Sequence, residues 1–271
     1  MTPVLPQPTA DQPLEPLRLQ PWNGPLYAER FGPQTERMVF LHGFTQTGRS
    51  WLPVATAFAR EHDVMLVDAP GHGGSASVRA DLRRTADLLG QTGGTATYVG
   101  YSMGGRMCLH LALTHPYLVP RLVLLSTTAG ISEETDRAAR RDHDDELADS
   151  IEDDGVAPFL DRWIAQPIFD GLSITEAERD DRLRNTPVGL ASSLRMAGTG
   201  TQDPLWARLK ELTMPVLILA GDRDTKFVDI GRQLAAGIQR STFVIVPGAG
   251  HAVHFEQPIA TAELIADFLR P

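Results

Sequence analysis

Short apolar runs alternate with helical patterns along most of the chain. Six runs are apolar on both faces and end at Gly, Asp, Ser or Pro; they lie at residues 38–41, 64–67, 96–99, 122–125, 216–219 and 243–246. Such runs are typical of buried parallel strands. Helical patterns lie between and after them, at residues 49–60, 82–91, 104–114 and 259–269. The alternation predicts an α/β fold, with helices covering both faces of a mostly parallel sheet.

The strand pattern is interrupted between about residues 131 and 206. This stretch contains helical patterns separated by prolines, and the strand pattern resumes only at Met214. We therefore predict a helical lid that is inserted between two strands of one sheet. The predicted parts are a flexible Pro-rich tail at residues 1–16, an α/β core at residues 17–130 and 207–271, and a helical lid at residues 131–206.

The composition of the 271-residue chain narrows the classes of function. Cys108 is the single cysteine, which excludes an internal disulfide and a Cys-rich zinc site. The net charge of -9 leaves no overall basic footprint for nucleic acid or an anionic membrane surface. No apolar run reaches the roughly 18 residues of a membrane-spanning helix, and residues 1–16 lack the pattern of a secretory signal. We therefore expect a cytoplasmic protein without membrane insertion.

The negative charge is concentrated in the predicted lid. Residues 133–154 contain eleven acidic side chains and three arginines, so the rest of the chain is nearly neutral. The simplest interpretation of this segment is a solvated helical face.

A candidate nucleophile lies at a predicted junction between a strand and a helix. The segment Gly100-Tyr101-Ser102-Met103-Gly104 fits the pattern G-x-S-x-G. The pattern alone is weak, but this context is the one that a nucleophile elbow requires, in which small flanking residues allow a tight turn. The alternative is an ordinary serine cap of a helix. We predict that Ser102 is catalytic.

A catalytic serine needs a base, and eight histidines are available. We favour His251, because it directly follows the last predicted strand and can lie above the carboxyl edge of the sheet. His254, His42 and His72 are the alternatives. His42 and His72 are better explained as structural residues of loops.

The base needs an acid to orient it, and Asp222 and Asp224 compete for this role. Both follow the penultimate predicted strand, which gives the chain order Ser, Asp, His of α/β-hydrolases. We favour Asp224, because Asp222 is simply explained as a turn residue. The backbone N–H groups of Phe44 and Met103 are the expected oxyanion hole.

Several motifs resemble the α/β-hydrolase fold family from about Leu26 to Leu269, and within it the 2-succinyl-6-hydroxy-2,4-cyclohexadiene-1-carboxylate synthases of menaquinone biosynthesis. The last three of the following stretches are the more restrictive. The resemblance rests on His42-Gly43-Phe44-Thr45, Asp68-Ala69-Pro70-Gly71-His72-Gly73, Gly100-Tyr101-Ser102-Met103-Gly104-Gly105-Arg106, Phe159-Leu160-Asp161-Arg162-Trp163, Gln166-Pro167-Ile168-Phe169 and Arg223-Asp224-Thr225-Lys226-Phe227.

The resemblance implies a lyase that eliminates pyruvate from a small substrate with several carboxylates, without a cofactor or metal. Arg106 suits this chemistry independently, because it lies about one helical turn after Ser102. A buried arginine is costly unless it is paired, and a substrate carboxylate is a bidentate partner for it. The alternative is a structural ion pair with a carboxylate of the protein.

The resemblance also implies further substrate-binding residues. Carried over by position, they are Tyr101, Arg140, Trp163, Arg184 and Lys226. The neighbours of Arg140 leave its register open, because Arg137 and Arg141 are near it in the sequence; all three could instead offset the acidic helical face. Trp163 could belong to the core of the lid.

Two rival classes of function stay open. One is a hydrolase of carboxylic esters or carbon–carbon bonds, in which Ser102 is a covalent nucleophile. The other is a binding module of the same fold that catalyses nothing. A triad alone does not separate them, because fold does not determine function. The sequence leaves the oligomeric state undetermined.

Overall fold

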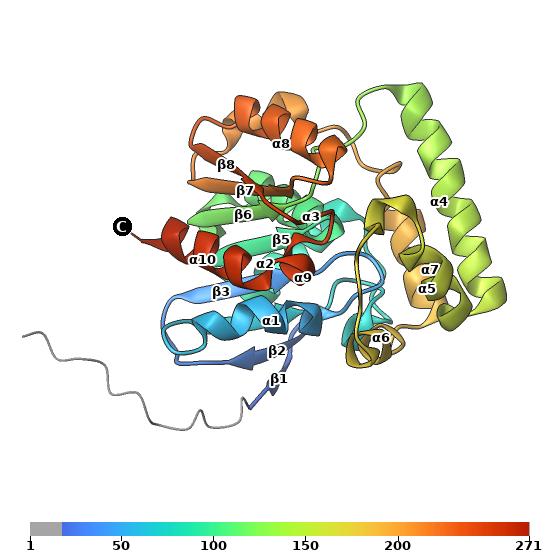
Figure 1. The fold of residues 1–271 in the computed structure, drawn as a ribbon, viewed down its shortest axis with the longest axis horizontal. Coiled ribbons are helices and arrows are strands. Elements are labelled where there is room, and N and C mark those ends of the chain that lie inside the picture. The colour runs from blue at the N-terminus through green and yellow to red at the C-terminus, as the bar shows by residue number, and fades with distance from the viewer. Residues whose placement is uncertain (1–17, 271) are drawn as a thin grey trace, which may run out of the picture.

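The computed structural model describes residues 18–270, in which eight strands form one sheet with helices on both faces (Figure 1). The predicted tail at residues 1–16 lies outside the described residues. The strands are β1 (Gln20–Asn23), β2 (Tyr27–Phe31), β3 (Arg37–Leu41), β4 (Asp63–Val67), β5 (Thr97–Tyr101), β6 (Arg121–Leu125), β7 (Val216–Gly221) and β8 (Ser241–Val246).

The strand order is β1-β2-β4-β3-β5-β6-β7-β8. β1 pairs antiparallel with β2 and β2 antiparallel with β4, and every other pair is parallel. The six predicted apolar runs correspond to β3 to β8. This arrangement confirms the predicted α/β-hydrolase fold, and it places the carboxyl ends of β3, β5, β7 and β8 along one edge, where loops can bring side chains together.

The helices that flank the sheet bury two separate apolar cores. α2, α3 and α8 pack on one face, and α1, α9 and α10 pack on the other. The helices of this α/β part are α1 (Leu52–Ala55), α2 (Leu82–Gly93), α3 (Met103–Thr114), α8 (Thr225–Gly237), α9 (Val253–Glu256) and α10 (Pro258–Leu269), with 3-10 turns η1 (Gly48–Trp51), η2 (Thr56–Phe58), η3 (Gly73–Ser75), η4 (Pro116–Leu118) and η6 (Trp206–Glu211).

The helix predicted at residues 49–60 is broken into η1, α1 and η2. Pro53 lies in the first turn of α1. Proline has no N–H to donate and fits a first turn better than a helix interior, so one continuous helix does not form there.

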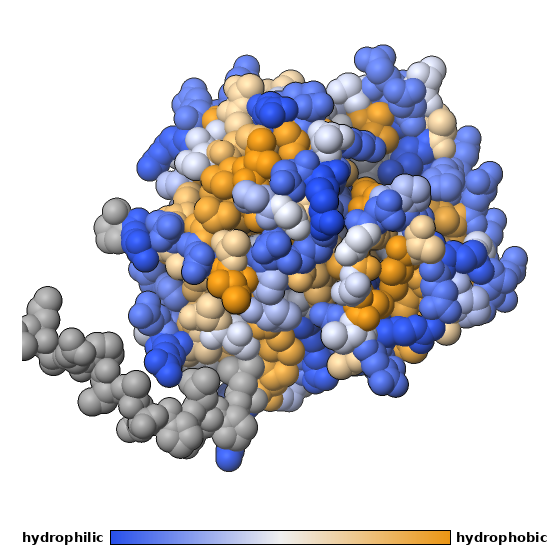
Figure 2. All heavy atoms as spheres, viewed as in Figure 1, coloured by the Kyte–Doolittle hydropathy of each residue, from blue (hydrophilic) through white to orange (hydrophobic). Residues whose placement is uncertain are grey.

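A helical segment lies between β6 and β7, beyond the carboxyl edge of the sheet (Figure 1). It contains α4 (Glu134–Asp154), α5 (Val156–Ile164), η5 (Pro167–Phe169), α6 (Glu176–Arg182) and α7 (Pro187–Ala197). α4, α5 and α7 share a small apolar core of their own, which includes Ile151, Phe159 and Leu190. Hydrophilic side chains cover the outer edge along α4 (Figure 2). The division into lid and core at residues 131 and 206 stays a prediction.

No helix within residues 18–270 combines the length and apolar character that crossing a membrane requires.

Candidate active site

Ser102 lies in a sharp turn between β5 and α3. Its backbone has φ of 50°, a left-handed value that is uncommon for residues other than glycine. A Cβ atom at Gly100 would come within 2.6 Å of the carbonyl oxygen of Gly104, and one at Gly104 would come within 2.2 Å of that of Leu41. Both glycines are therefore required for α3 to start so close to the sheet, which raises the serine above its carboxyl edge.

Ser102, His251 and Asp224 form a hydrogen-bonded chain. Nε2 of His251 lies 3.2 Å from Oγ of Ser102, and Nδ1 lies 2.7 Å from Oδ2 of Asp224. The other carboxylate oxygen of Asp224 accepts a hydrogen bond of 3.2 Å from the backbone N–H of Phe227, at the start of α8. The aspartate is thus held at both oxygens, and the arrangement fits a base that is oriented by an acid and directed at a serine.

The alternative bases and the alternative acid lie elsewhere. His42 donates from Nδ1 to the Gly43 carbonyl at 2.7 Å and accepts from the Ala69 N–H at 3.0 Å. Nδ1 of His72 lies 3.0 Å from the carbonyl oxygen of Pro70. Burial lowers the pKa of both imidazoles, to about 4 for His42 and to about 3 for His72. These two histidines therefore hold loops together in their neutral form.

His254 is fully buried behind the site, where its ring packs 4.3 Å from that of Tyr101, and Asp222 is exposed. Among residues 18–270, no hydrogen bond joins either of them to Ser102 or His251.

Two backbone N–H groups border Ser102, as an oxyanion hole requires. Phe44 follows β3 and Met103 follows the serine, and both residues line one small cavity with Ser102. Within the described residues, neither N–H is engaged in a hydrogen bond. Such free and fixed donors can stabilise an oxygen on which negative charge develops.

Arg106 is buried beside this cavity and has no acidic partner. Its side chain is on α3 and lines the cavity with Ser102, and the residue is 6% exposed. Nη1 donates to Oε1 of Gln202 at 3.2 Å, and no carboxylate of residues 18–270 lies within 4.0 Å. Burial, assisted by the nearby charge of Arg140, lowers the pKa of Arg106 to about 10, so it is still charged at neutral pH. The structural ion pair considered above is therefore not formed.

Arg140 and Lys226 both line a second cavity next to Ser102. This cavity has a volume of about 190 Å³, and both residues line it together with His251. Arg140, on α4, forms an ion pair of 2.8 Å with the buried Asp144. The exposed Lys226, on α8, has its Nζ 5.9 Å from the centre of the Phe227 ring. Both predicted residues are therefore brought to the serine.

The hydrogen-bond partners of the three arginines of α4 resolve which of them lines the cavity. Arg137 donates to the carbonyl oxygens of Ile131 and Ser132, and Arg141 donates to that of Gly200. Both also pair with Glu134. Their hydrogen bonds hold the ends of the helical segment, which leaves Arg140 as the arginine of α4 that lines the cavity.

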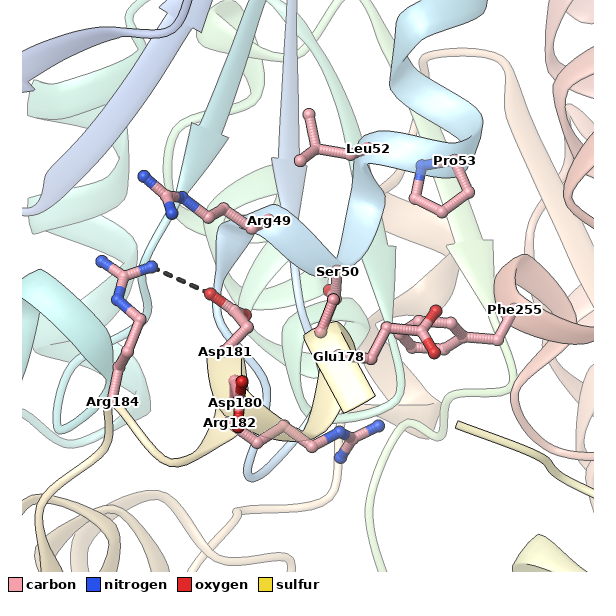
Figure 3. A pocket seen from close by; sticks show the side chains of 11 residues that line it. Arg49, Ser50, Leu52, Pro53, Glu178, Asp180, Asp181, Arg182, Arg184 and Phe255 are labelled. Atoms are coloured by element: carbon pink, nitrogen blue, oxygen red, sulfur yellow. Dashed lines mark hydrogen bonds and ion pairs between the residues drawn. The ribbon is translucent and has the colours of Figure 1, made fainter. Parts of the chain in front are cut away.

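The structure does not bring Arg184 to Ser102. Arg184 lies beyond the end of α6 and pairs with Asp181 at 2.9 Å, on the wall of a separate cleft of about 600 Å³ (Figure 3). Arg182 lines the cavity of Ser102 in its place and also borders this cleft. Arg182 is the last residue of α6, whereas Arg184 lies in the turn that follows it, so helical spacing does not set the direction of the Arg184 side chain.

The sequence analysis missed Arg182, which is 4% exposed. Its Nη1 donates to Oγ1 of Thr45 at 2.7 Å, its guanidinium lies over the ring of Phe255, and its Nε has no partner. Burial lowers its pKa, and no carboxylate of the described residues lies within 4.0 Å of it. A capping box between Thr175 and Glu178 starts α6 and is a signal that could have set its register.

Aromatic side chains form the apolar walls of the cavity. The rings of Trp163 and Phe44 meet edge to face at 5.1 Å, and Phe169 lies 5.9 Å from His251. The ring of Tyr101 lies 5.4 Å from that of His251, and burial raises its pKa. Trp163 therefore contributes both to the core of the helical segment and to the cavity.

Comparison with known proteins decides the family. The profile of the alpha/beta hydrolase family matches residues 38–264. The chain belongs to the alpha/beta hydrolase family.

In residues 18–270, no group of three or more His, Cys, Asp or Glu side chains is placed to hold a metal ion.

Relatives over most of the chain share one name. The 2-succinyl-6-hydroxy-2,4-cyclohexadiene-1-carboxylate synthase of Enterobacter sp. (strain 638) is 32% identical over 243 residues, which cover 86% of this chain and 91% of the relative. A Bacillus subtilis (strain 168) protein, provisionally given the same name, is 36% identical over 248 residues, or 87% and 90% of the two chains. The solved structure of MenH from S. aureus has 32% sequence identity and a TM-score of 0.81 over 89% of this chain and 97% of that one. Within the alpha/beta hydrolase family, this chain groups with these synthases.

Proposed function

We propose that this protein is a carbon–oxygen lyase of menaquinone biosynthesis, which eliminates pyruvate from a 5-enolpyruvoyl-succinyl-cyclohexene carboxylate. The product would be 2-succinyl-6-hydroxy-2,4-cyclohexadiene-1-carboxylate, as in the names of the relatives. A small anion with several carboxylates is therefore the proposed substrate, and no cofactor takes part.

The observation that carries the proposal is the set of cations around Ser102. Four cations line the two cavities that adjoin Ser102, in a protein with a net charge of -9: Arg106, Arg140, Arg182 and Lys226. Of these four cations, only Arg140 has a carboxylate partner within the described part of the chain. Burying a cation without a partner is costly, so a site that keeps two such arginines is suited to a ligand that brings its own carboxylates. An esterase for neutral substrates has no use for them.

In the proposed mechanism, Ser102 acts as a base. His251, oriented by Asp224, takes the proton of the serine hydroxyl, and the serine oxygen removes a proton from a ring carbon of the substrate. The electron pair of that C–H bond moves through the conjugated system and breaks the bond between ring carbon and ether oxygen. The enolate of pyruvate leaves and takes up the proton held by His251, which gives pyruvate and restores the neutral imidazole, while the serine keeps the ring proton as its hydroxyl hydrogen. The N–H groups of Phe44 and Met103 and the surrounding cations stabilise the anionic transition state.

One assay tests the proposal directly. The purified protein is incubated with the enolpyruvoyl intermediate, while pyruvate release and the absorbance of the diene product are followed together. We expect both to appear at equal rates and to be abolished in Ser102→Ala. Absence of both products, with a correctly folded protein, would refute the lyase assignment.

The geometry of the triad also favours a second candidate, a hydrolase of esters or carbon–carbon bonds. The distance of 3.2 Å between His251 and Ser102 and the free N–H groups suit covalent attack by the serine as well as they suit proton removal. The two chemistries differ in whether a substrate-derived adduct forms on Ser102, which is measurable.

A further inference from the structure

Gln202 contacts Arg106 from the segment that leads from α7 back to β7. The glutamine is 1% exposed, although it lies in a connection between helices. Its Oε1 accepts the hydrogen bond of 3.2 Å from Nη1 of Arg106, and its Nε2 has no partner. Among residues 18–270 this is the one hydrogen bond of the Arg106 guanidinium. A residue of the inserted segment therefore contacts a cation of the α/β part beside Ser102.

The backbone around Gln202 is tied to the point where the chain leaves the sheet after β6. The N–H of Leu205 donates to the carbonyl of Ala129 at 2.7 Å, and the indole of Trp206 donates to the carbonyl of Gly130 at 2.9 Å. A Cβ atom at Gly130 would lie 3.3 Å from Nε2 of Gln202. The segment that carries Gln202 is thus held against the segment that follows β6.

The partner of Arg106 is a neutral amide where a carboxylate would fit. An amide oxygen orients a guanidinium through one hydrogen bond but does not neutralise it, whereas a carboxylate would form an ion pair and compete with an anionic ligand. We propose that Gln202 is a positioning residue that aims Arg106 at a substrate carboxylate while leaving its charge available. This inference rests on the proposed function, because it takes the ligand of Arg106 to be a carboxylate of the substrate.

Two substitutions separate orientation from charge. Gln202→Glu keeps the shape of the side chain and adds a negative charge beside Arg106. Gln202→Met keeps an unbranched side chain of similar size and removes the hydrogen-bond acceptor. The matched control is Gln239→Glu, which makes the same change in charge at an exposed residue between α8 and β8.

We expect Gln202→Glu to raise KM for the enolpyruvoyl substrate at least tenfold, with a much smaller change in kcat, because carboxylate binding is lost before the chemical step. The melting temperature should stay the same or rise, since the new carboxylate pairs with a buried cation. Gln202→Met should also raise KM, and Gln239→Glu should leave KM, kcat and melting temperature unchanged. A purely structural role would instead lower the melting temperature in both Gln202 variants and reduce activity in step with it.

Binding of succinate, a simple dicarboxylate, is measured separately from turnover. We expect succinate to raise the melting temperature of the wild type and of Gln239→Glu, and to have little effect on Gln202→Glu. If the wild type binds succinate in this way but releases no pyruvate, the role of Gln202 stands and the proposed function fails. If the wild type releases pyruvate while Gln202→Glu keeps its KM and its response to succinate, the positioning role is refuted.

Discussion

Replacement of Arg106 by alanine tests the role of the buried cations most sharply. A charge-assisted hydrogen bond contributes about 1.5–3 kcal/mol, which corresponds to about 10- to 150-fold in an equilibrium constant. With a pKa lowered only to about 10, Arg106 carries its charge at pH 7 and can make such bonds. We therefore expect Arg106→Ala to lower kcat/KM for the carboxylated substrate at least tenfold.

A loss of stability in Arg106→Ala could also lower the activity, but the structure predicts that the change in stability is small. The lost packing of the arginine stem costs about 0.8 kcal/mol per methylene group. Removing a buried charge that has no carboxylate partner offsets part of this cost. The melting temperature should therefore change little, whereas loss of a structural ion pair would lower it strongly.

The assay couples pyruvate release to a spectroscopic readout over a range of substrate concentrations, and p-nitrophenyl acetate serves as a neutral comparison. The matched control is Arg162→Ala, which removes an exposed arginine of α5 that pairs with Asp154. A selective loss on the anionic substrate at an unchanged melting temperature supports substrate binding. An equal loss on both substrates together with a large fall in melting temperature would refute the reasoning.

Three further predictions concern the triad and the buried histidines. Asp224→Asn should leave the fold intact and lower kcat by several orders of magnitude, by analogy with the roughly 10⁴-fold loss in the protease triad. Asp222→Asn should lower kcat much less. If Asp222→Asn causes the larger loss of kcat, Asp222 is the acid. With the natural substrate, mass spectrometry of a rapidly quenched reaction should find no adduct on Ser102, and an adduct that decays at the turnover rate would instead favour the hydrolase. The free energy of unfolding should fall as the pH drops from about 6.5 towards 4. Burial holds the pKa of His42 near 4 and that of His72 near 3, so the unfolded chain takes up protons before the folded chain does. Urea denaturation between pH 7.5 and 5 measures this fall, and a flat profile would contradict it.

The parallel sheet and the elbow were predictable because their signals are local. Apolar runs on both faces of a strand and glycines around Ser102 follow directly from burial and from a sharp turn. β1 and β2 were missed for different reasons. In β2, Glu29 and Arg30 interrupt the apolar run. β1 is a short segment at the sheet edge whose residues include a glutamine, a proline and an asparagine. An edge strand buries little, so burial leaves no apolar pattern in its sequence.

Among the cations of the site, only Arg106 was predictable from residue spacing alone, whereas Arg140 and Lys226 followed from the family resemblance. Arg106 follows Ser102 by one turn of α3, and its place near the serine follows from that spacing. Arg182 and Arg184 differ by two positions at the end of α6, and only the end of that helix decides which one faces the cavity. Gln202 had no signal at all, because a neutral amide in a connecting segment resembles any polar loop residue.

The predicted pH dependence is a balance of opposing groups, and Asp68 supplies the opposition. Burial raises the pKa of Asp68 to about 6, although its oxygens accept hydrogen bonds of 2.7 Å from the N–H groups of Gly48 and Gly74. Its folded pKa lies above the unfolded value of 3.8, so the folded state takes up this proton first and gains stability as the pH falls through 6. His42 and His72 act in the opposite direction, each by at most about 1.4 kcal/mol per pH unit. Burial also lowers the pKa values of His110 and His254, so the histidines together outweigh the single carboxylate. Asp68→Asn should therefore make the loss of stability in acid steeper; a shallower slope would show that the carboxylate is not the opposing group.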